Sequence, residues 1–409
     1  MKKSIFRFAA LALMAASACV SCLEDMVGKE DMEGMIGSES SIDGSEVPEG
    51  GSEGNTNAGK LTAGEWRDLD NWNFWSGLML NQDSAQSYSE YNSYWQFYTG
   101  NRVAVKAVSS TGKPVVGAYI VLKKGNEVIW ETRTDNRGRA ECWVNLFTGQ
   151  QIPEEELSIS IDGVDMPGRI RVMDWKTDRF LDGQSDDQIL FNGYLVDQRP
   201  ESNDVDIAFI VDATGSMSDE ISFLKSDLVD IIGKVGNGSS RNIRTAALMY
   251  RDEGDDYVTR VSNFADVKST SNFISEQNAA GGGDYPEAVH TALEKALQSL
   301  SWNADAHTRL AFMLLDAPAH HNDEVIASLH KQIASFAKAG IRIIPVAASG
   351  VDKATEFMLR YFAIATDGTY TFLTNHSGIG GDHIVPTIGD YKVEQLNELI
   401  VRLVTEFIE

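Results

Sequence analysis

Oxygen-bearing side chains stand at three places in the C-terminal half of the chain, each in a segment that follows an apolar run or is rich in glycine. DATGSM supplies Asp212, Thr214 and Ser216, GGGDYPEA supplies Asp284, and LLDAPAH supplies Asp316. Carboxylate and hydroxyl oxygens are the hard donors that Mg²⁺ and Ca²⁺ prefer, whereas Zn²⁺ is usually held by nitrogen and sulfur. Carboxylates crowded together without a cation repel one another, so we expect these residues to hold one Mg²⁺ or Ca²⁺ ion.

The sequence around these residues predicts elements that would bring them together. After Asp204, strand and helix signals alternate six times. A buried strand is expected over 206–213, and helices over 286–300, 323–339, 353–365 and 393–408. Such alternation predicts an α/β fold with a doubly wound, mostly parallel six-stranded sheet, in which ligands bind beyond the carboxyl ends of the strands.

These loops, together with the segment YRDEGDDY, resemble the von Willebrand factor A domain in its hemicentin-like and bacterial subgroup, from about Asp204 to Glu409. The resemblance implies a metal-ion-dependent adhesion site built from an Asp-x-Ser-x-Ser loop, a Thr and an Asp. Asp212, Thr214, Ser216 and Asp316 match that pattern, with Thr214 in place of a Ser. It also implies one coordination position that a carboxylate of a protein partner completes.

Asp284 falls where that family usually has Thr, and two interpretations stay open. A third acidic group near the ion would lower its electrophilicity, and would favour Ca²⁺ or weaken the capture of an acidic partner residue. Alternatively, Asp284 caps the helix expected to begin at Pro286, because Asp is favoured just before a first helical turn.

The N-terminal residues predict export and lipid attachment. Residues 1–21 combine basic residues with a short apolar stretch and small residues, as a secretory signal does. The sequence up to Cys22 resembles the lipobox of bacterial lipoproteins, with Cys19 as the alternative, and LEDMVGKED after it resembles the surface-export tag of Bacteroides-type lipoproteins. We expect an outer-membrane lipoprotein at the cell surface, or facing the periplasm, that touches the membrane through its lipid only. An ordinary cleaved signal is the alternative.

Three segments follow the signal. Residues 22–60 are rich in acidic residues, Gly and Ser and contain no aromatic residue, which predicts a disordered tether. Residues 61–100 carry ten aromatic residues and are expected to pack on the next domain; a sugar-stacking surface is the alternative. Residues 101–200 alternate with period two and predict a small all-β sandwich and a connector before the domain at 201–409. STGKPVVGAYIVL and TDNRGRA within it resemble the carboxypeptidase regulatory-like fold.

Composition narrows the function classes. With 60 acidic against 35 basic residues the net charge is -25, which argues against nucleic-acid binding. Ser216 with His320 or His321 lacks the G-x-S-x-G elbow of a hydrolase, and no phosphate loop is present, so we expect no enzyme. We expect a cation-dependent binder of an extracellular or envelope protein. The alternative is a glycan-binding lipoprotein that uses the aromatic segment or the sandwich.

Overall fold

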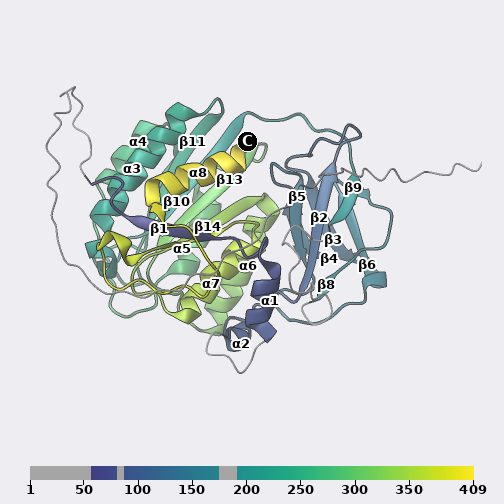
Figure 1. Cartoon of the computed structure of the whole chain (residues 1–409), viewed down its shortest axis with the longest axis horizontal. Coiled ribbons are helices and arrows are strands. Elements are labelled where there is room, and N and C mark those ends of the chain that lie inside the picture. The colour runs from purple at the N-terminus through teal and green to yellow at the C-terminus, as the bar shows by residue number, and fades with distance from the viewer. Residues whose placement is uncertain (1–56, 81–86, 175–190) are drawn as a thin grey trace, which may run out of the picture. The chain divides into compact units, whose positions relative to one another are not determined.

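The computed structural model describes residues 57–80, 87–174 and 191–409 (Figure 1). The expected signal at 1–21, both candidate lipidation sites, Cys19 and Cys22, and nearly all of the tether at 22–60 lie outside these residues and stay predictions. Within the described ranges, no helix has both the length and the apolar character that crossing a bilayer requires.

The larger part of the structure is a sheet of eight strands in the order β12-β11-β10-β13-β14-β15-β1-β16. The strands are β1 (Thr62–Trp66), β10 (Asp204–Asp212), β11 (Asn242–Tyr250), β12 (Thr259–Ala265), β13 (Thr308–Leu315), β14 (Ile341–Ala347), β15 (Tyr370–Leu373) and β16 (Glu394–Gln395). The neighbours from β11 to β15 are parallel, whereas β12 and β1 run antiparallel to their neighbours.

Helices cover both faces of this sheet (Figure 1). They are α3 (Ile221–Gly238), α4 (Val267–Ser275), α5 (Val289–Ser299), α6 (Asp323–Ala339), α7 (Lys353–Ala365) and α8 (Leu396–Ile408). Alternate residues of β10 point to opposite faces. Ile207 and Phe209 belong to the core under α3, α4 and α8, whereas Ala208 and Ile210 belong to the core under α5, α6 and α7. The predicted doubly wound, mostly parallel α/β fold is therefore confirmed, but the sheet has eight strands instead of the expected six, because β1 and β16 extend it beyond β15.

Helix ends follow their capping residues. The predicted bounds of α6 and α7 are confirmed: the side chain of Asn322 accepts from the Val325 amide at the start of α6, Gly340 ends it in the left-handed conformation, and Asp352 caps α7. Helix α5 begins three residues later than predicted, because the Glu287 amide donates to the Pro318 carbonyl instead of entering a helix. Helix α4 was not predicted.

A smaller all-β part precedes this sheet and contains two four-stranded sheets, β5-β2-β8 with β9 on β2, and β4-β3-β6-β7. Its strands are β2 (Asn101–Val108), β3 (Tyr119–Lys124), β4 (Glu127–Arg133), β5 (Arg139–Trp143), β6 (Leu157–Ile161), β7 (Val164–Asp165), β8 (Met173–Asp174) and β9 (Asn192–Leu195). Inward side chains of both sheets, including Val103 and Ile120, share one core. Cys142 is a buried free thiol in that core.

The aromatic segment at 61–100 contacts both parts of the structure, whereas the sequence indicated packing on the sandwich. Its first strand, β1, pairs antiparallel with β15 of the large sheet, with Ala63 opposite Leu373. Two helices follow, α1 (Trp72–Leu80) and α2 (Ser89–Trp95). The Trp72 ring lies 5.8 Å from that of Trp143 in the sandwich, and the Trp75 ring lies 5.8 Å from that of Phe357 in α7. Five of the ten aromatic residues are buried and four are half-buried, and Tyr94 is the one that is exposed, which leaves few faces for a sugar.

A buried ion pair attaches this segment to the large sheet's helical cover. Arg360 of α7 donates from Nε to Asp68 Oδ2 at 2.9 Å and from Nη2 to Asp68 Oδ1 at 2.5 Å. Both side chains are almost completely buried. A buried bidentate pair is costly to break because the remaining charge has no solvent to stabilise it.

Replacing Asp68→Asn should therefore lower the free energy of unfolding by about 3 kcal/mol, because Arg360 would keep its charge without its main partner. The measurement is urea unfolding of the full chain at neutral pH. The matched control is Asp165→Asn, because Asp165 is 81% exposed and 3.4 Å from Lys123, and its loss should cost less than about 1 kcal/mol. Equal effects of the two substitutions would contradict this account.

Candidate metal centre

The fold places the loops that carry Asp212 and Asp316 side by side, at the carboxyl ends of two neighbouring strands. Asp212 is the last residue of β10, and Asp316 directly follows β13. These two strands are parallel neighbours, and the strand order reverses between them, because β11 and β12 continue to one side and β14 and β15 to the other. Such a reversal leaves a crevice beyond the carboxyl ends of the strands, where open α/β sheets bind ligands.

Three of the five predicted site residues form one hydrogen-bonded group, and Asp316 lies beside it. Asp212 Oδ1 accepts from the Thr214 amide at 2.9 Å and from Thr214 Oγ1 at 2.7 Å. Thr214 Oγ1 lies 3.1 Å from Ser216 Oγ, and Ser216 lies close enough to Asp316 to stabilise the charged form of its carboxylate. Asp212, Thr214 and Asp316 are buried, whereas Ser216 is exposed at the surface of the crevice.

The glycine-rich loop is fastened beside this group by backbone and side-chain bonds. The Gly215 amide donates to the Gly281 carbonyl at 3.0 Å, and the Gly282 amide donates to Asp255 Oδ2 at 2.9 Å. Arg251, itself buried, donates to the carbonyls of Ala213 at 3.0 Å and Asn278 at 2.9 Å. The segment after β11 therefore supports the site instead of standing free in solvent.

Asp284 lies at the opening of the site, and one of its two interpretations is wrong. Its side chain is exposed and lines the same hollow as Ser216 and Asp316. It does not cap α5, because that helix begins at Val289 and its N-cap position is Ala288, with no side-chain cap. Whether Asp284 contacts a cation stays a prediction.

Glu287, three residues further along, is a site residue that the sequence reasoning missed. It is only 2% exposed and lines the hollow. Burial and the nearby charges of Asp212, Asp252 and Asp316 raise the pKa of Glu287 to about 9. Glu287 is the glutamate of GGGDYPEA, so it stood beside a predicted site residue. It was missed because a helix beginning at Pro286 would have placed it in a first helical turn.

These side chains line a hollow of about 710 Å³ at the edge of the sheet. We call it the site hollow. Its polar lining includes Ser216, Asp284, Tyr285, Glu287, Asp316 and Asp382.

The buried oxygens of the site fit a cation. Asp212 Oδ2, Glu287 Oε2 and Asp316 Oδ1 are buried and lack a hydrogen-bond partner. Burial and the charge of Asp316 raise the pKa of Asp212 to about 7, and burial raises that of Asp316 to about 6. A bound cation would coordinate the unpaired oxygens and would offset the energetic cost of burying their negative charges. No three His, Cys, Asp or Glu side chains of the described segments form a metal cluster by themselves, so the hydroxyls of Thr214 and Ser216 would have to contribute.

The histidines next to Asp316 are engaged elsewhere. His320 Nε2 lies 2.7 Å from Asp252 Oδ1, and the His321 ring stacks on Tyr94 with ring centres 3.7 Å apart. Neither residue lines the site hollow. Their contacts therefore give Ser216 no general base.

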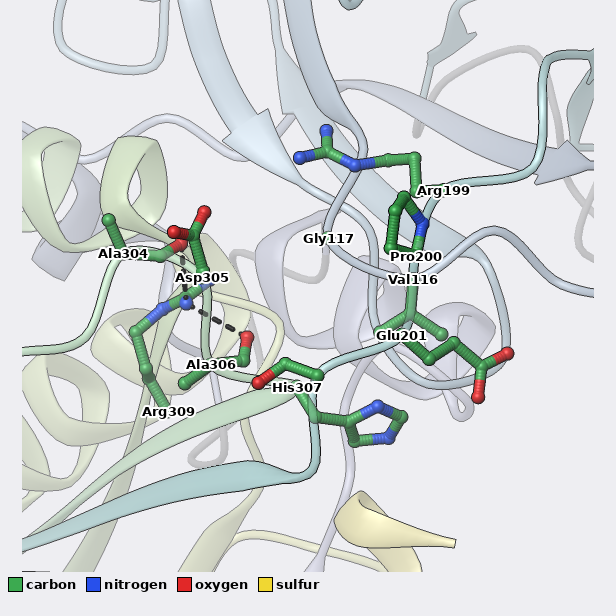
Figure 2. Close-up of a pocket in the computed structure, with 11 residues that line it drawn as sticks. Val116, Gly117, Arg199, Pro200, Glu201, Ala304, Asp305, Ala306, His307 and Arg309 are labelled. Carbon is green, nitrogen blue, oxygen red and sulfur yellow. Dashed lines mark hydrogen bonds between the residues drawn. The ribbon is translucent and has the colours of Figure 1, made fainter.

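A second hollow, of about 320 Å³, lies at the opposite edge of the sheet, near the start of β13 (Figure 2). Arg309 points to backbone carbonyls there, donating to those of Ala304 at 3.1 Å and Ala306 at 3.0 Å. Arg199 pairs with Asp162 at 2.6 Å. Because both arginine side chains already have partners, this hollow presents no set of ligands comparable to that of the site hollow.

Comparison with known families identifies the domain that carries the site. Residues 206–367 match the family model of the von Willebrand factor A domain. These residues form a von Willebrand factor A domain. The match runs from β10 to the end of α7 and so includes all three loops of the site.

Curated relatives share this A domain only in part. A protein of Acanthamoeba polyphaga mimivirus named as an ariadne-like RING finger protein is 33% identical over 131 residues, 32% of this chain and 12% of that protein. An alpha-protein kinase of Dictyostelium discoideum is 36% identical over 120 residues, 28% of this chain and 19% of that protein. The chain therefore spans less than a fifth of either relative's length.

Solved structures of proximal thread matrix protein 1 from the mussel byssus are also similar. One, described as having a zinc-occupied MIDAS motif, has a TM-score of 0.34 and 16% identity over 41% of each chain. Another has a TM-score of 0.32 and 16% identity over 40% of each chain. The assignment of the A domain rests on the family match and not on these two structures.

Without a cation, the chain should lose stability as pH rises from about 4 to 8. The folded-state pKa values of Asp212, about 7, and Asp316, about 6, lie above the ordinary value of 3.8, so the folded chain binds more protons than the unfolded one in this range. Their contribution is complete below about pH 4 and is lost as pH rises through 6 and 7. Thermal unfolding across this range, in EDTA and in excess Mg²⁺ or Ca²⁺, measures the effect.

In EDTA the Asp212→Asn variant should give a flatter curve of melting temperature against pH, because one of the repelling carboxyl groups is gone. Excess cation should flatten the curve of the unmodified chain in the same way. An identical slope for both proteins in EDTA would show that Asp212 does not carry the effect.

Proposed function

We propose that this chain is a surface lipoprotein whose A domain binds another protein through a divalent cation held at the site hollow. The observation that supports this most directly is the group of buried carboxylate oxygens without hydrogen-bond partners at the switch point of the sheet. Buried carboxylates are normally paired or coordinate a metal, and no cationic side chain forms an ion pair with Asp212 or Asp316 among the described residues.

Asp212, Thr214, Ser216 and Asp316 would hold the ion, with Mg²⁺ or Ca²⁺ as the natural choice for an all-oxygen set. The bound ion would supply a concentrated positive charge at the surface of an otherwise acidic protein. Ser216 is exposed, so a donor from outside can approach beside it. A partner would complete the coordination with an oxygen ligand, of which an acidic side chain is the simplest example.

The location follows from the N-terminal sequence. In this proposal a lipid on Cys22, or on Cys19, attaches the protein to the outer membrane, and the acidic segment at 22–60 holds the folded part away from the surface by charge repulsion and chain extension. The partner would then be an extracellular or envelope protein.

The chain would act by binding and not by turnover. The Ser216 hydroxyl lies 3.1 Å from Thr214 Oγ1 and near the Asp316 carboxylate, in the manner of a ligand and not of a nucleophile paired with a base. His320 and His321 form hydrogen bonds with Asp252 and Tyr94.

The test has two stages on the full chain. Calorimetric titration with MgCl₂ and CaCl₂ should show one cation per chain, and Asp212→Ala should weaken binding by about tenfold or more. Immobilised chain should then retain a set of envelope proteins that EDTA releases and that Asp212→Ala does not retain.

Asp165→Ala is the control for both stages, because Asp165 is an exposed carboxylate on the sandwich. It should bind cation and envelope proteins as the unmodified chain does. Retention that survives both EDTA and Asp212→Ala would remove the proposal, as would a chain that binds neither ion.

A further inference from the structure

We infer that Glu287 is a further ligand of the cation, acting together with the hydroxyls of Thr214 and Ser216, because the acidic side chains of the described residues form no metal cluster by themselves. This inference rests on the proposed cation site and goes beyond it, because the residue comes from a position that the family pattern did not indicate. Three independent features of the structure point to it: the way its backbone is fixed, the space that Gly282 leaves for it, and its burial without a partner.

The backbone of Glu287 is held in register with the loop that carries Asp316. The Glu287 amide donates to the Pro318 carbonyl at 2.8 Å, and Glu287 forms an isolated parallel bridge with Ala319. This short pairing postpones the start of α5 to Val289. It therefore fixes the Glu287 side chain relative to Asp316, as a ligand must be fixed to keep its geometry.

Gly282 shows where the Glu287 carboxyl lies. Its φ is +73°, and a Cβ added there would come within 3.1 Å of Glu287 Oε1 and 3.4 Å of the Thr214 Cβ. The Glu287 carboxyl and Thr214 therefore flank the same small space below the glycine loop. Both the backbone conformation and that space favour glycine at this position.

Burial without a partner distinguishes Glu287 from a structural glutamate. The side chain is 2% exposed, Oε2 has no hydrogen-bond partner, and no basic side chain of the described residues forms an ion pair with it. Its charged neighbours include Asp212 and Asp316, which repel it. A fold that needed only packing here would be more stable with an uncharged residue, whereas a cation between the three carboxylates makes the arrangement favourable.

The third carboxylate should also affect which ion is bound. Ca²⁺ accepts six to eight oxygen ligands in flexible geometry, and its affinity rises with the number of charged ligands. Mg²⁺ requires a near-octahedral set and retains several waters. Three carboxylates and two hydroxyls from three separate loops match the first description better, so Glu287 should favour Ca²⁺.

The experiment compares Glu287→Gln with Asp165→Asn in the full chain, by calorimetric titration with CaCl₂ and MgCl₂. Both substitutions replace a carboxyl group by an amide, but Asp165 is 81% exposed on the sandwich and does not line the site hollow. Glu287→Gln should weaken Ca²⁺ binding by about tenfold or more and Mg²⁺ binding less, whereas Asp165→Asn should stay within about twofold.

Melting temperature provides a second readout that a purely structural role would not give. Added Ca²⁺ should raise the melting temperature of Glu287→Gln less than it raises that of the unmodified chain. If Glu287→Gln fails to fold, Glu287→Asp replaces it, and its shorter carboxylate should weaken Ca²⁺ binding while retaining the preference for Ca²⁺ over Mg²⁺.

Two results would overturn the inference in different ways. Ca²⁺ binding by Glu287→Gln, or by a folded Glu287→Asp, that equals the unmodified chain would show that Glu287 is not a ligand and would leave the proposed function standing. An unmodified chain that binds neither ion would remove the proposed function, and the inference with it.

Discussion

Repulsion between buried carboxyl groups at the carboxyl edge of β10 and β13 is the constraint to which the surrounding loops respond. Asp212 and Asp316 are brought together by two parallel strands, and neither forms an ion pair with a basic side chain of the described residues. The nearby hydroxyls and backbone amides compensate only in part, since Asp212 Oδ2 and Asp316 Oδ1 remain without a hydrogen bond. Asp255 and Arg251 lie next to the site, but their side chains hydrogen bond to backbone atoms of the loops around it and do not neutralise its carboxyl groups. A cation bound from solution would therefore stabilise this arrangement more than any side chain around it does.

The sequence predicted the A-domain fold well, because its signals were local. The continuous apolar run of β10 and the caps of α6, Asn322 and Gly340, each act within a few residues of the element they define. The loops carrying Asp212, Thr214, Ser216 and Asp316 could be placed for the same reason, because they follow predicted strands. Glu287 could not be placed, because its position depends on a hydrogen bond to Pro318, in another loop, and helix propensity alone favoured an earlier start for α5. Local signals thus predicted the polar side chains at strand ends and missed Glu287, whose place is set by a tertiary contact.

Segment 61–100 shows the same limit on a larger scale. Its ten aromatic residues indicated burial, and nine of them are buried or half-buried, but only one of the two parts that they contact was predicted. Trp72 packs on the sandwich, whereas Trp75 and Tyr88 pack on α7, and Tyr88 donates a hydrogen bond to buried Glu356. Strand β1 has a short sequence without a clear apolar alternation, so nothing in it identified β15, some three hundred residues away, as its neighbour. Composition predicts that a segment is buried, but only the fold shows which elements it packs against.

The pairing of β1 with β15 also sets an order of events during synthesis. The ribosome makes β1 before the whole sandwich and before every other strand of the large sheet, yet its neighbours β15 and β16 come last. Closing a loop of that length costs entropy that only completed contacts can repay. The sandwich can fold early, while β1 and Asp68 must wait, with an open strand edge and an unmatched charge, until Arg360 and β15 emerge. The large sheet therefore cannot be completed before β15 is made, and a chain truncated before β15 lacks the strand with which β1 pairs.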